Sequence, residues 1–217
     1  RADEMGDRTF AALNVVAIEA RAGDGARPIP FAAGLPDAYF EHDGQITKRE
    51  VRAITLSSLQ PAPGALLWDI GLGSGSVAIE WLLSHPANRA IGFEKSAGRA
   101  ACAGRNAACL GVPHLEVREG DALQTVKTAP APDAVFIGGG VRSAELRAAC
   151  WAALKPGGRM VCNVVTLEGQ AALMACRAAW GGTLTRIAIE REHEVGRFTA
   201  WRPALAVVQW AAAKPWP

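Results

Sequence analysis

Three acidic residues stand where short apolar runs end, and a glycine-rich loop follows the first of them. The stretch WDIGLGSGSVAIE (residues 68–80) places Asp69 at the end of an apolar run, directly before the loop Gly71–Gly75. Glu94 and Asp121 close the next two apolar runs. Ligands of open α/β sheets bind beyond the carboxyl ends of the strands. The three acids and the loop therefore predict a cofactor site at that edge.

The residue types around the loop distinguish between cofactors. A nicotinamide fingerprint counted from Gly71 would have Gly or Ala where this chain has Ser76, and Asp69 would lie unfavourably beside a pyrophosphate. Asp69 suits the ammonium of S-adenosyl-L-methionine, Glu94 can accept hydrogen bonds from ribose hydroxyls, and Asp121 stands where the adenine edge would lie. The pattern resembles the first motif of the class I methyltransferases. We therefore predict S-adenosyl-L-methionine as cofactor, with S-adenosyl-L-homocysteine as product, and keep a nicotinamide oxidoreductase as a disfavoured alternative.

The composition is that of a globular protein without a dedicated nucleic-acid surface. Of 217 residues, 50% are hydrophobic and 20% charged, and the net charge is +2, which is too balanced for a nucleic-acid binder. No apolar run reaches the length of a membrane span. The five cysteines form no Cys-x-x-Cys pair and have no histidine cluster near them, so we predict no metal site and buried free thiols. An odd number of reduced thiols favours the cytoplasm.

Apolar strands alternate with amphipathic helices from residue 46 onward. This order predicts an α/β fold with a Rossmann-like, seven-stranded, mostly parallel sheet. The resemblance of the glycine loop implies that the fold is of the class I S-adenosylmethionine-dependent methyltransferase type. The last two strands have no helix between them, so they should form a hairpin with an antiparallel last strand. The predicted strands are 65–71, 89–95, 115–121, 132–139, 159–165, 183–192 and 204–212. The predicted helices are 46–59, 76–84, 96–111, 142–154 and 167–180.

The first 33 residues differ from the rest. The apolar run 13–20 is a strand without a partner, and a Gly- and Pro-containing linker follows it. We expect residues 1–33 to be the last strand of a preceding domain plus a linker, and residues 34–217 to be the methyltransferase domain. The first residue is Arg1 and not Met, which fits a piece of a longer protein.

Several motifs together resemble one family in order. They are GLPDAYFEHDGQITKREVRA, WDIGLGSGSVAIEW, EGDA, PDAVFIGGG and LKPGGRMVCNVVTLE, within residues 34–180. The chain resembles the decarboxylating precorrin methyltransferases of cobalamin (vitamin B12) biosynthesis. The resemblance implies methylation of carbon 15 of a precorrin and decarboxylation of the carbon-12 acetate. It also implies a homotetramer and, in aerobic organisms, a fused N-terminal domain that methylates carbon 5.

The resemblance also implies which residues contact the cofactor. Thr47, at the start of a predicted helix, and Ala122, beside Asp121, join the loop and the acids. The full set is Thr47, Asp69, Gly71, Leu72, Gly73, Ser74, Gly75, Glu94, Asp121 and Ala122. Thr47 and Glu50 also have the spacing of a capping box.

A precorrin carries many carboxylates, so its pocket should offer cations. The candidates are Lys48, Arg49, Arg52 and Arg142, the first three of which oppose the dipole of the predicted helix. No residue stands out as a catalytic acid or base. Many relatives have Ser-Gly-Gly where this chain has Gly140–Arg142, and Asn-Pro where it has Arg202 and Pro203.

Two other kinds of function stay open. One is a class I RNA or protein methyltransferase, which an extended basic patch would favour. The other is a non-catalytic tetrapyrrole-binding module, which a degraded cofactor loop would favour.

Overall fold

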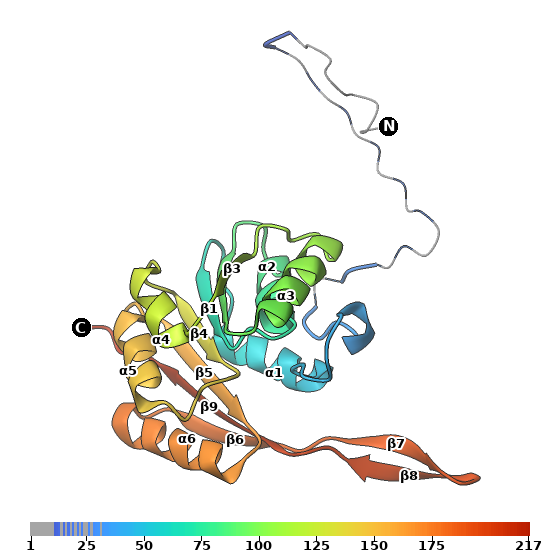
Figure 1. Ribbon diagram of the computed structural model, residues 1–217, viewed down its shortest axis with the longest axis vertical. Helices are drawn as coiled ribbons and strands as arrows, with labels where there is room; N and C mark the ends of the chain where they lie inside the picture. The colour runs from blue at the N-terminus through green and yellow to red at the C-terminus, as the bar shows by residue number, and fades with distance from the viewer. Residues whose placement is uncertain are drawn as a thin grey trace.

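The structure is a computed structural model that describes residues 11–13, 15, 17, 19, 21, 23, 26, 28–30 and 32–217. The strand predicted over residues 13–20 lies partly outside the described residues, so it stays a prediction. The domain boundary predicted between residues 33 and 34 stays a prediction as well. From residue 34 onward the chain forms one α/β body from which a two-stranded arm projects (Figure 1).

A seven-stranded sheet organises the body, in the order β3-β2-β1-β4-β5-β9-β6. Its strands are β1 Leu66–Ile70, β2 Arg89–Glu94, β3 Glu116–Glu119, β4 Ala134–Ile137, β5 Arg159–Val164, β6 Thr183–Ile187 and β9 Val207–Ala213. Strands β3 to β5 of this order pair in parallel, and β9 is antiparallel to both β5 and β6. The predicted seven-stranded, mostly parallel sheet with an antiparallel last strand is confirmed.

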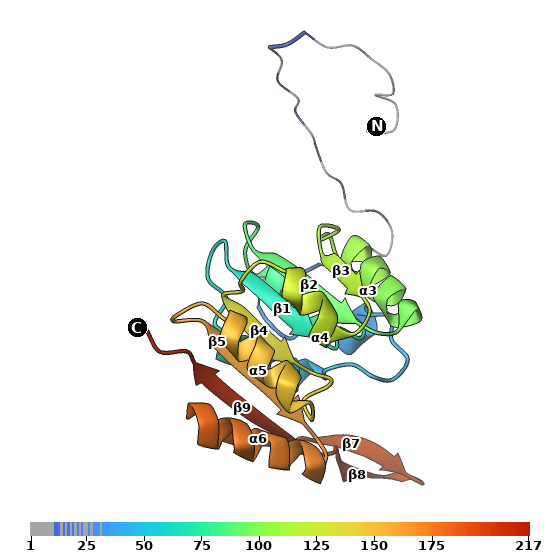
Figure 2. The ribbon, with the colours of Figure 1, turned by 60° about the vertical axis from the view of Figure 1, so that its left-hand side comes forward.

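Helices cover both faces of the sheet (Figure 2). α1 Arg49–Leu59, α2 Ser76–Leu83 and α3 Ala97–Cys109 pack on one face, and α4 Ala122–Thr125, α5 Ala144–Ala153 and α6 Leu167–Trp180 pack on the other. β1 contributes to the core on both faces, because successive side chains of a strand point to opposite sides of the sheet. Leu67 packs on the face of α1, α2 and α3, and Trp68 and Ile70 pack on the face of α4, α5 and α6. The central strands are therefore buried on both sides, and their carboxyl ends meet at one edge.

The capping box predicted for Thr47 and Glu50 is wrong. α1 begins at Arg49, Lys48 is its N-cap, and no side-chain oxygen caps the helix. Thr47 lies one residue outside, in the segment that leads into the helix. The helix α4 was not predicted, since it has only four residues and follows β3 after a tight turn at Gly120.

The predicted strand 183–192 is in fact two strands. β6 ends at Ile187, and β7 Glu190–Val195 leaves the main sheet to pair with β8 Phe198–Pro203. Every residue of β7 and β8 is exposed, so the pair is held by its own ladder of hydrogen bonds and not by a core. This β7–β8 arm extends away from the body in Figure 1. Within the part of the chain that the structure describes, no helix has the length and hydropathy that a bilayer crossing needs.

Candidate functional site

The glycine loop lies over the carboxyl ends of β1, β2 and β4. The backbone N–H groups of Gly71 and Leu72 donate to the carbonyl of Phe93, at 2.9 and 3.1 Å. Gly71 has φ +75, and a Cβ there would stand 2.7 Å from the backbone nitrogen of Gly139, after β4. A side chain would force the two loops apart, so glycine is required. In contrast, a Cβ on Gly73 would meet nothing closer than 3.8 Å, which leaves space above the loop.

Asp69 is buried beneath this loop, with 1% of its surface exposed. Its Oδ2 accepts the N–H of Ala78 in the first turn of α2, whose N-cap Gly75 provides no side-chain cap. Its Oδ1 has no hydrogen-bond partner. Burial raises the pKa of Asp69 to about 8, the hydrogen bond from Ala78 lowers it, and the charge of Glu94 raises it. A cationic donor at Oδ1 would stabilise the ionised form.

Glu94 ends β2 and is also buried, at 7% exposure. Its Oε2 accepts the N–H of Gly73 at 2.9 Å, and its Oε1 accepts the N–H of Ser96 at 3.0 Å. The carboxylate thus joins the tip of the glycine loop to the N-terminus of α3. Each oxygen retains acceptor capacity, because an ionised carboxylate offers about four lone-pair sites. Glu94 can therefore receive two neighbouring hydroxyl groups without losing its present contacts.

Asp121 and Ala122 lie at the next strand end. Asp121 is the N-cap of α4, and its Oδ1 accepts the N–H of Leu123 at 2.9 Å. Its side chain is exposed, and Ala122 is half-buried. The sheet thus brings the predicted cofactor residues of β1, β2 and β3 to one edge, in the spatial order that the strand pairing fixes.

Arg52 is not placed to bind a substrate carboxylate, contrary to the prediction from the sequence. Its side chain is fully buried and donates to Oε1 of Glu80 at 2.5 Å, to Asp37 at 3.2 Å and to the backbone carbonyls of Thr47 and Leu35. Glu80 in turn accepts the N–H groups of Leu35, at 2.8 Å, and of the preceding glycine. Because its donors are engaged inside the protein, Arg52 is not available to a substrate carboxylate. Its contacts instead hold the segment 34–47 against α1 and α2.

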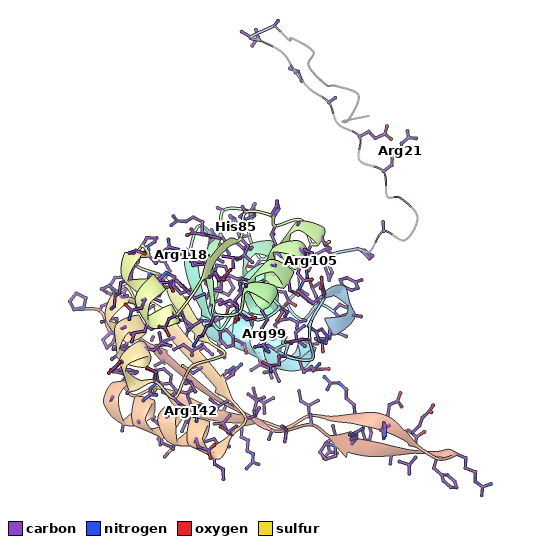
Figure 3. The ribbon with its side chains drawn as sticks, in the orientation of Figure 1. Arg21, His85, Arg99, Arg105, Arg118 and Arg142 are labelled. Carbon is purple, nitrogen blue, oxygen red and sulfur yellow. The ribbon has the colours of Figure 1, made fainter. Side chains whose placement is uncertain are left out.

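The remaining predicted cations are exposed at the same edge. Lys48 and Arg49 lie at the start of α1, and Lys48 is 3.7 Å from the carboxylate of Asp37. Arg142 lies in the loop between β4 and α5 and is exposed; Figure 3 shows it on the side of the body where α6 lies. Arg49 and Arg142 are therefore exposed to a ligand, and Lys48 is exposed as well although it forms an ion pair with Asp37.

A group around Asn106 closes the site on the α3 side and was missed by sequence reasoning. Asn106 is 4% exposed; it donates to the carbonyls of Ser74 (2.9 Å) and Glu41 (2.8 Å), and it accepts the N–H of Glu41. Arg105 pairs with Glu41 at 2.6 Å, and Arg99 pairs with Asp43 at 2.8 Å. Figure 3 shows both arginines on α3. Asn106 thus links the glycine loop to the segment 41–43.

A pocket of about 670 Å³ lies between these groups and the tip of the glycine loop. It is lined by Glu41, His42, Asp43, Gly73, Ser74, Ser96, Gly98, Arg99, Cys102 and Arg105. Its position beside Glu94 and the N-terminus of α3 is suitable for the polar end of a nucleoside-like ligand.

The cysteines and possible metal ligands give no further site. Cys150, Cys162 and Cys176 are buried free thiols, as predicted, and burial raises the pKa of Cys150 to about 12. Cys109 is exposed and Cys102 half-buried, so the prediction of burial is wrong for Cys109. Among the described residues, no group of three His, Cys, Asp or Glu side chains could hold a metal ion.

The sheet order and the glycine loop with its strand-end acids define the fold class of the S-adenosylmethionine-dependent methyltransferases. A family described as "precorrin methyltransferase domain" matches residues 38–214. The chain belongs to this family.

Proteins that are similar to this chain include two curated relatives and one solved structure. The precorrin-6Y C(5,15)-methyltransferase [decarboxylating] of Sinorhizobium sp is 54% identical over 202 residues, which are 93% of this chain and 49% of that protein. A probable cobalt-precorrin-6B C(15)-methyltransferase (decarboxylating) of Pyrobaculum calidifontis is 34% identical over 78% of this chain and 91% of that protein. The C-terminal domain of precorrin-6Y C5,15-methyltransferase from Rhodobacter capsulatus has a TM-score of 0.81 at 41% identity, covering 86% of this chain and 100% of that one. The chain spans about half the length of the curated precorrin-6Y relatives.

Proposed function

We propose that this chain transfers a methyl group from S-adenosyl-L-methionine to carbon 15 of a precorrin and removes the carboxyl group of the carbon-12 acetate, in cobalamin biosynthesis. The observation that carries the proposal is the family match over residues 38–214, in which the loop Gly71–Gly75 and the acids Asp69 and Glu94 are present. The names of the relatives from Sinorhizobium and Pyrobaculum support the same reaction.

The residues at the edge of the sheet fit the cofactor. The unpartnered Oδ1 of Asp69 is an acceptor for an ammonium, directly or through a water molecule. The spare lone pairs of Glu94 suit a pair of ribose hydroxyls, and the space over Gly73 leaves the backbone approachable. Thr47, Leu72, Ser74, Asp121 and Ala122 complete the proposed set of contacts.

The bound cofactor supplies an electrophilic methyl group on its sulfonium. The task of the protein is to hold the acceptor carbon in line with that methyl group and to exclude water, since positioning is the main source of acceleration in such a transfer. Lys48, Arg49 and Arg142 would bind the peripheral carboxylates of the precorrin and so fix its orientation. Loss of carbon dioxide leaves an electron pair on the acetate carbon, and the conjugated macrocycle can accept it. No side chain is assigned as a general acid or base.

A mass measurement tests the reaction. The chain is incubated with S-adenosyl-L-methionine and a precorrin-6B-type substrate, and the product is analysed for one gained methyl group and one lost carbon dioxide. Omission of S-adenosyl-L-methionine is the control. Recovery of unchanged substrate from the complete mixture would contradict the proposal.

We also propose that the chain self-associates, as a tetramer, through the β7–β8 arm. An isolated two-stranded hairpin is marginally stable in water, and this one exposes 67% of Phe198 and 72% of Trp201. Light scattering after gel filtration should give a smaller mass for a Phe198→Ser, Trp201→Ser variant than for the wild type. An unchanged mass would contradict assembly through the arm.

The remaining proposals concern the context of the chain. Since the chain spans about half of the precorrin-6Y relatives, we propose that residues 1–33 connect it to an N-terminal carbon-5 methyltransferase domain, and that the enzyme acts in the cytoplasm without nucleic-acid or membrane partners.

A further inference from the structure

The β7–β8 arm starts at the ligand-binding edge of the sheet. β9 is antiparallel to both β5 and β6, so β6 runs in the same direction as β5. The end of β6 at Ile187 therefore lies at the same edge as the end of β5 at Val164, and β7 begins three residues later. The base of the arm is thus placed beside the mouth of the site, although the arm has no part in the core.

The arm has two chemically different faces. In the ladder of β7 and β8, Arg191 lies opposite Arg202, and His193 lies opposite Ala200. Because side chains alternate along a strand, these residues share one face, while Glu190, Glu192 and Glu194 share the other. One face is basic near the base of the arm, and the other is acidic.

The basic face is directed toward α1. Arg191 forms an ion pair with Glu50, in the first turn of α1 and next to the exposed Lys48 and Arg49. The side chain of Arg202 is exposed and has no ion pair or hydrogen bond in the described part of the chain. Two arginines opposite each other in a ladder repel, and Glu50 offsets the charge of only one. The pair leaves one positive charge without a partner at the mouth of the site.

Three exposed apolar residues follow strands that end at this edge of the sheet or at the base of the arm. Val165, just after β5, Leu167, at the start of α6, and Leu205, just after β8, expose 48%, 76% and 79% of their surfaces. The last ladder pair of β5 and β9 joins Val164 to Val208, so Val165 and the chain leading into β9 leave the sheet at the same edge. A planar apolar ring with carboxylates on its periphery would match this arrangement. The ring would lie over Val165, Leu167 and Leu205, and the carboxylates would reach Arg191 and Arg202.

We propose that Arg191 and Arg202, at the base of the arm, form a carboxylate-binding subsite for the tetrapyrrole acceptor, whose ring lies against Val165, Leu167 and Leu205. The proposal rests on the proposed function for the identity of the ligand. It gives the arm a second task, that of extending the acceptor site beyond the sheet, so that binding of substrate depends on the arm as well as on Lys48, Arg49 and Arg142.

Charge reversal at two positions of the arm tests this subsite. Arg202→Glu changes the base, and Arg197→Glu makes the same change of charge at the turn between β7 and β8. The probe is an octacarboxylic porphyrin titrated into the protein at low salt, with fluorescence as the readout. We expect Arg202→Glu to weaken binding by roughly 3- to 10-fold, as for a solvent-exposed charge contact, and Arg197→Glu to leave it within twofold. The difference should shrink at high salt.

Three measurements separate the possible outcomes. S-adenosyl-L-methionine affinity, measured by calorimetry, should be equal in both variants and the wild type, which shows that the body is intact. Equal porphyrin affinity in the two variants, with methyl transfer retained, would overturn the subsite and leave the proposed function standing. A wild type that binds the porphyrin through Arg202 but transfers no methyl group would support the subsite and overturn the proposed function.

Discussion

Over β1 and β2 the groups that face the site are buried and hydrogen-bonded, whereas over β4, β5 and the base of the arm they are exposed. In the first region, here the cofactor half, Asp69 and Glu94 are held by backbone N–H groups of the loop and of two helices. In the second, the acceptor half, Arg142 and Arg202 are exposed. A buried carboxylate needs fixed donors, so this chain arranges the cofactor half by itself; we expect the exposed side chains of the acceptor half to become ordered only when a ligand binds.

The contrast predicts that the largest effect on stability comes from the buried ion pair of Arg52 and Glu80. Arg52→Ala should lower the free energy of unfolding by about 3–5 kcal/mol, because Glu80 is left as an uncompensated buried charge. Urea denaturation measures it. Arg49→Ala, an exposed arginine of the same helix, is the control and should change stability by less than about 0.5 kcal/mol. Equal losses in both variants would mean that the buried network does not set the stability of this half.

Loss of Glu94 should have the next largest effect. Glu94→Ala removes the proposed acceptor of the ribose hydroxyls and the contacts with Gly73 and Ser96. S-adenosyl-L-methionine should therefore bind roughly 10- to 100-fold more weakly, the range for hydrogen bonds to a charged group. Calorimetry is the measurement, and Glu119→Ala, at the exposed end of β3, is the control. Unchanged affinity in Glu94→Ala would refute the cofactor assignment.

The raised pKa of Asp69 predicts a pH dependence that is peculiar to the cofactor half. The folded protein keeps a proton to about pH 8 that the unfolded chain releases near its ordinary pKa of 3.8. Stability from this group is therefore complete below about pH 4 and falls as pH rises toward 8, by at most about 1.4 kcal/mol per pH unit. Urea denaturation across this range should show the slope, and Asp69→Asn should reduce it. An identical slope in the variant would show that other groups cause it.

Asn106 should affect cofactor binding by a smaller amount. Asn106→Ala frees the carbonyl of Ser74 and the segment at Glu41, so we expect a loss of stability of about 1–3 kcal/mol and a several-fold rise in the Michaelis constant for S-adenosyl-L-methionine. Asn88→Ala is a matched control, because Asn88 is also buried and bonds to the far end of α2. An equal rise in both variants would mean that Asn106 acts through general stability and not through the loop.

The smallest effect is expected in the acceptor half. Arg49→Ala should weaken binding of a precorrin or a carboxylated porphyrin by a few-fold, as for exposed charge contacts, and leave S-adenosyl-L-methionine affinity unchanged. Titrations of both ligands against the same preparation provide the comparison. Equal weakening of both would remove the distinction between the two halves.

The amino-acid sequence determined the fold class, the order of the main-sheet strands and the longer helices, and the glycine loop, because these depend on local patterns. Alternating apolar segments, the spacing of Gly71–Gly75 and an acid at each strand end are all readable within a few residues. The acids at the ends of β1, β2 and β3 could be read from these local patterns, and parallel pairing brings the three strand ends together; their contacts with a cofactor stay a prediction.

The tertiary structure decided which charged residues are inside and which are free. Arg52 and Lys48 are neighbours on one helical face in the sequence pattern, but contacts with Glu80, 28 positions away, bury the first and leave the second exposed. The bridge from Asn106 to Glu41 spans 65 positions, and the ion pair of Arg191 with Glu50 spans 141. Such contacts depend on how the layers pack, and no local periodicity encodes them. The break between β6 and β7, which creates the arm, also depends on tertiary packing. β6 pairs with β9 as far as Ile187, whereas every residue of β7 and β8 is exposed.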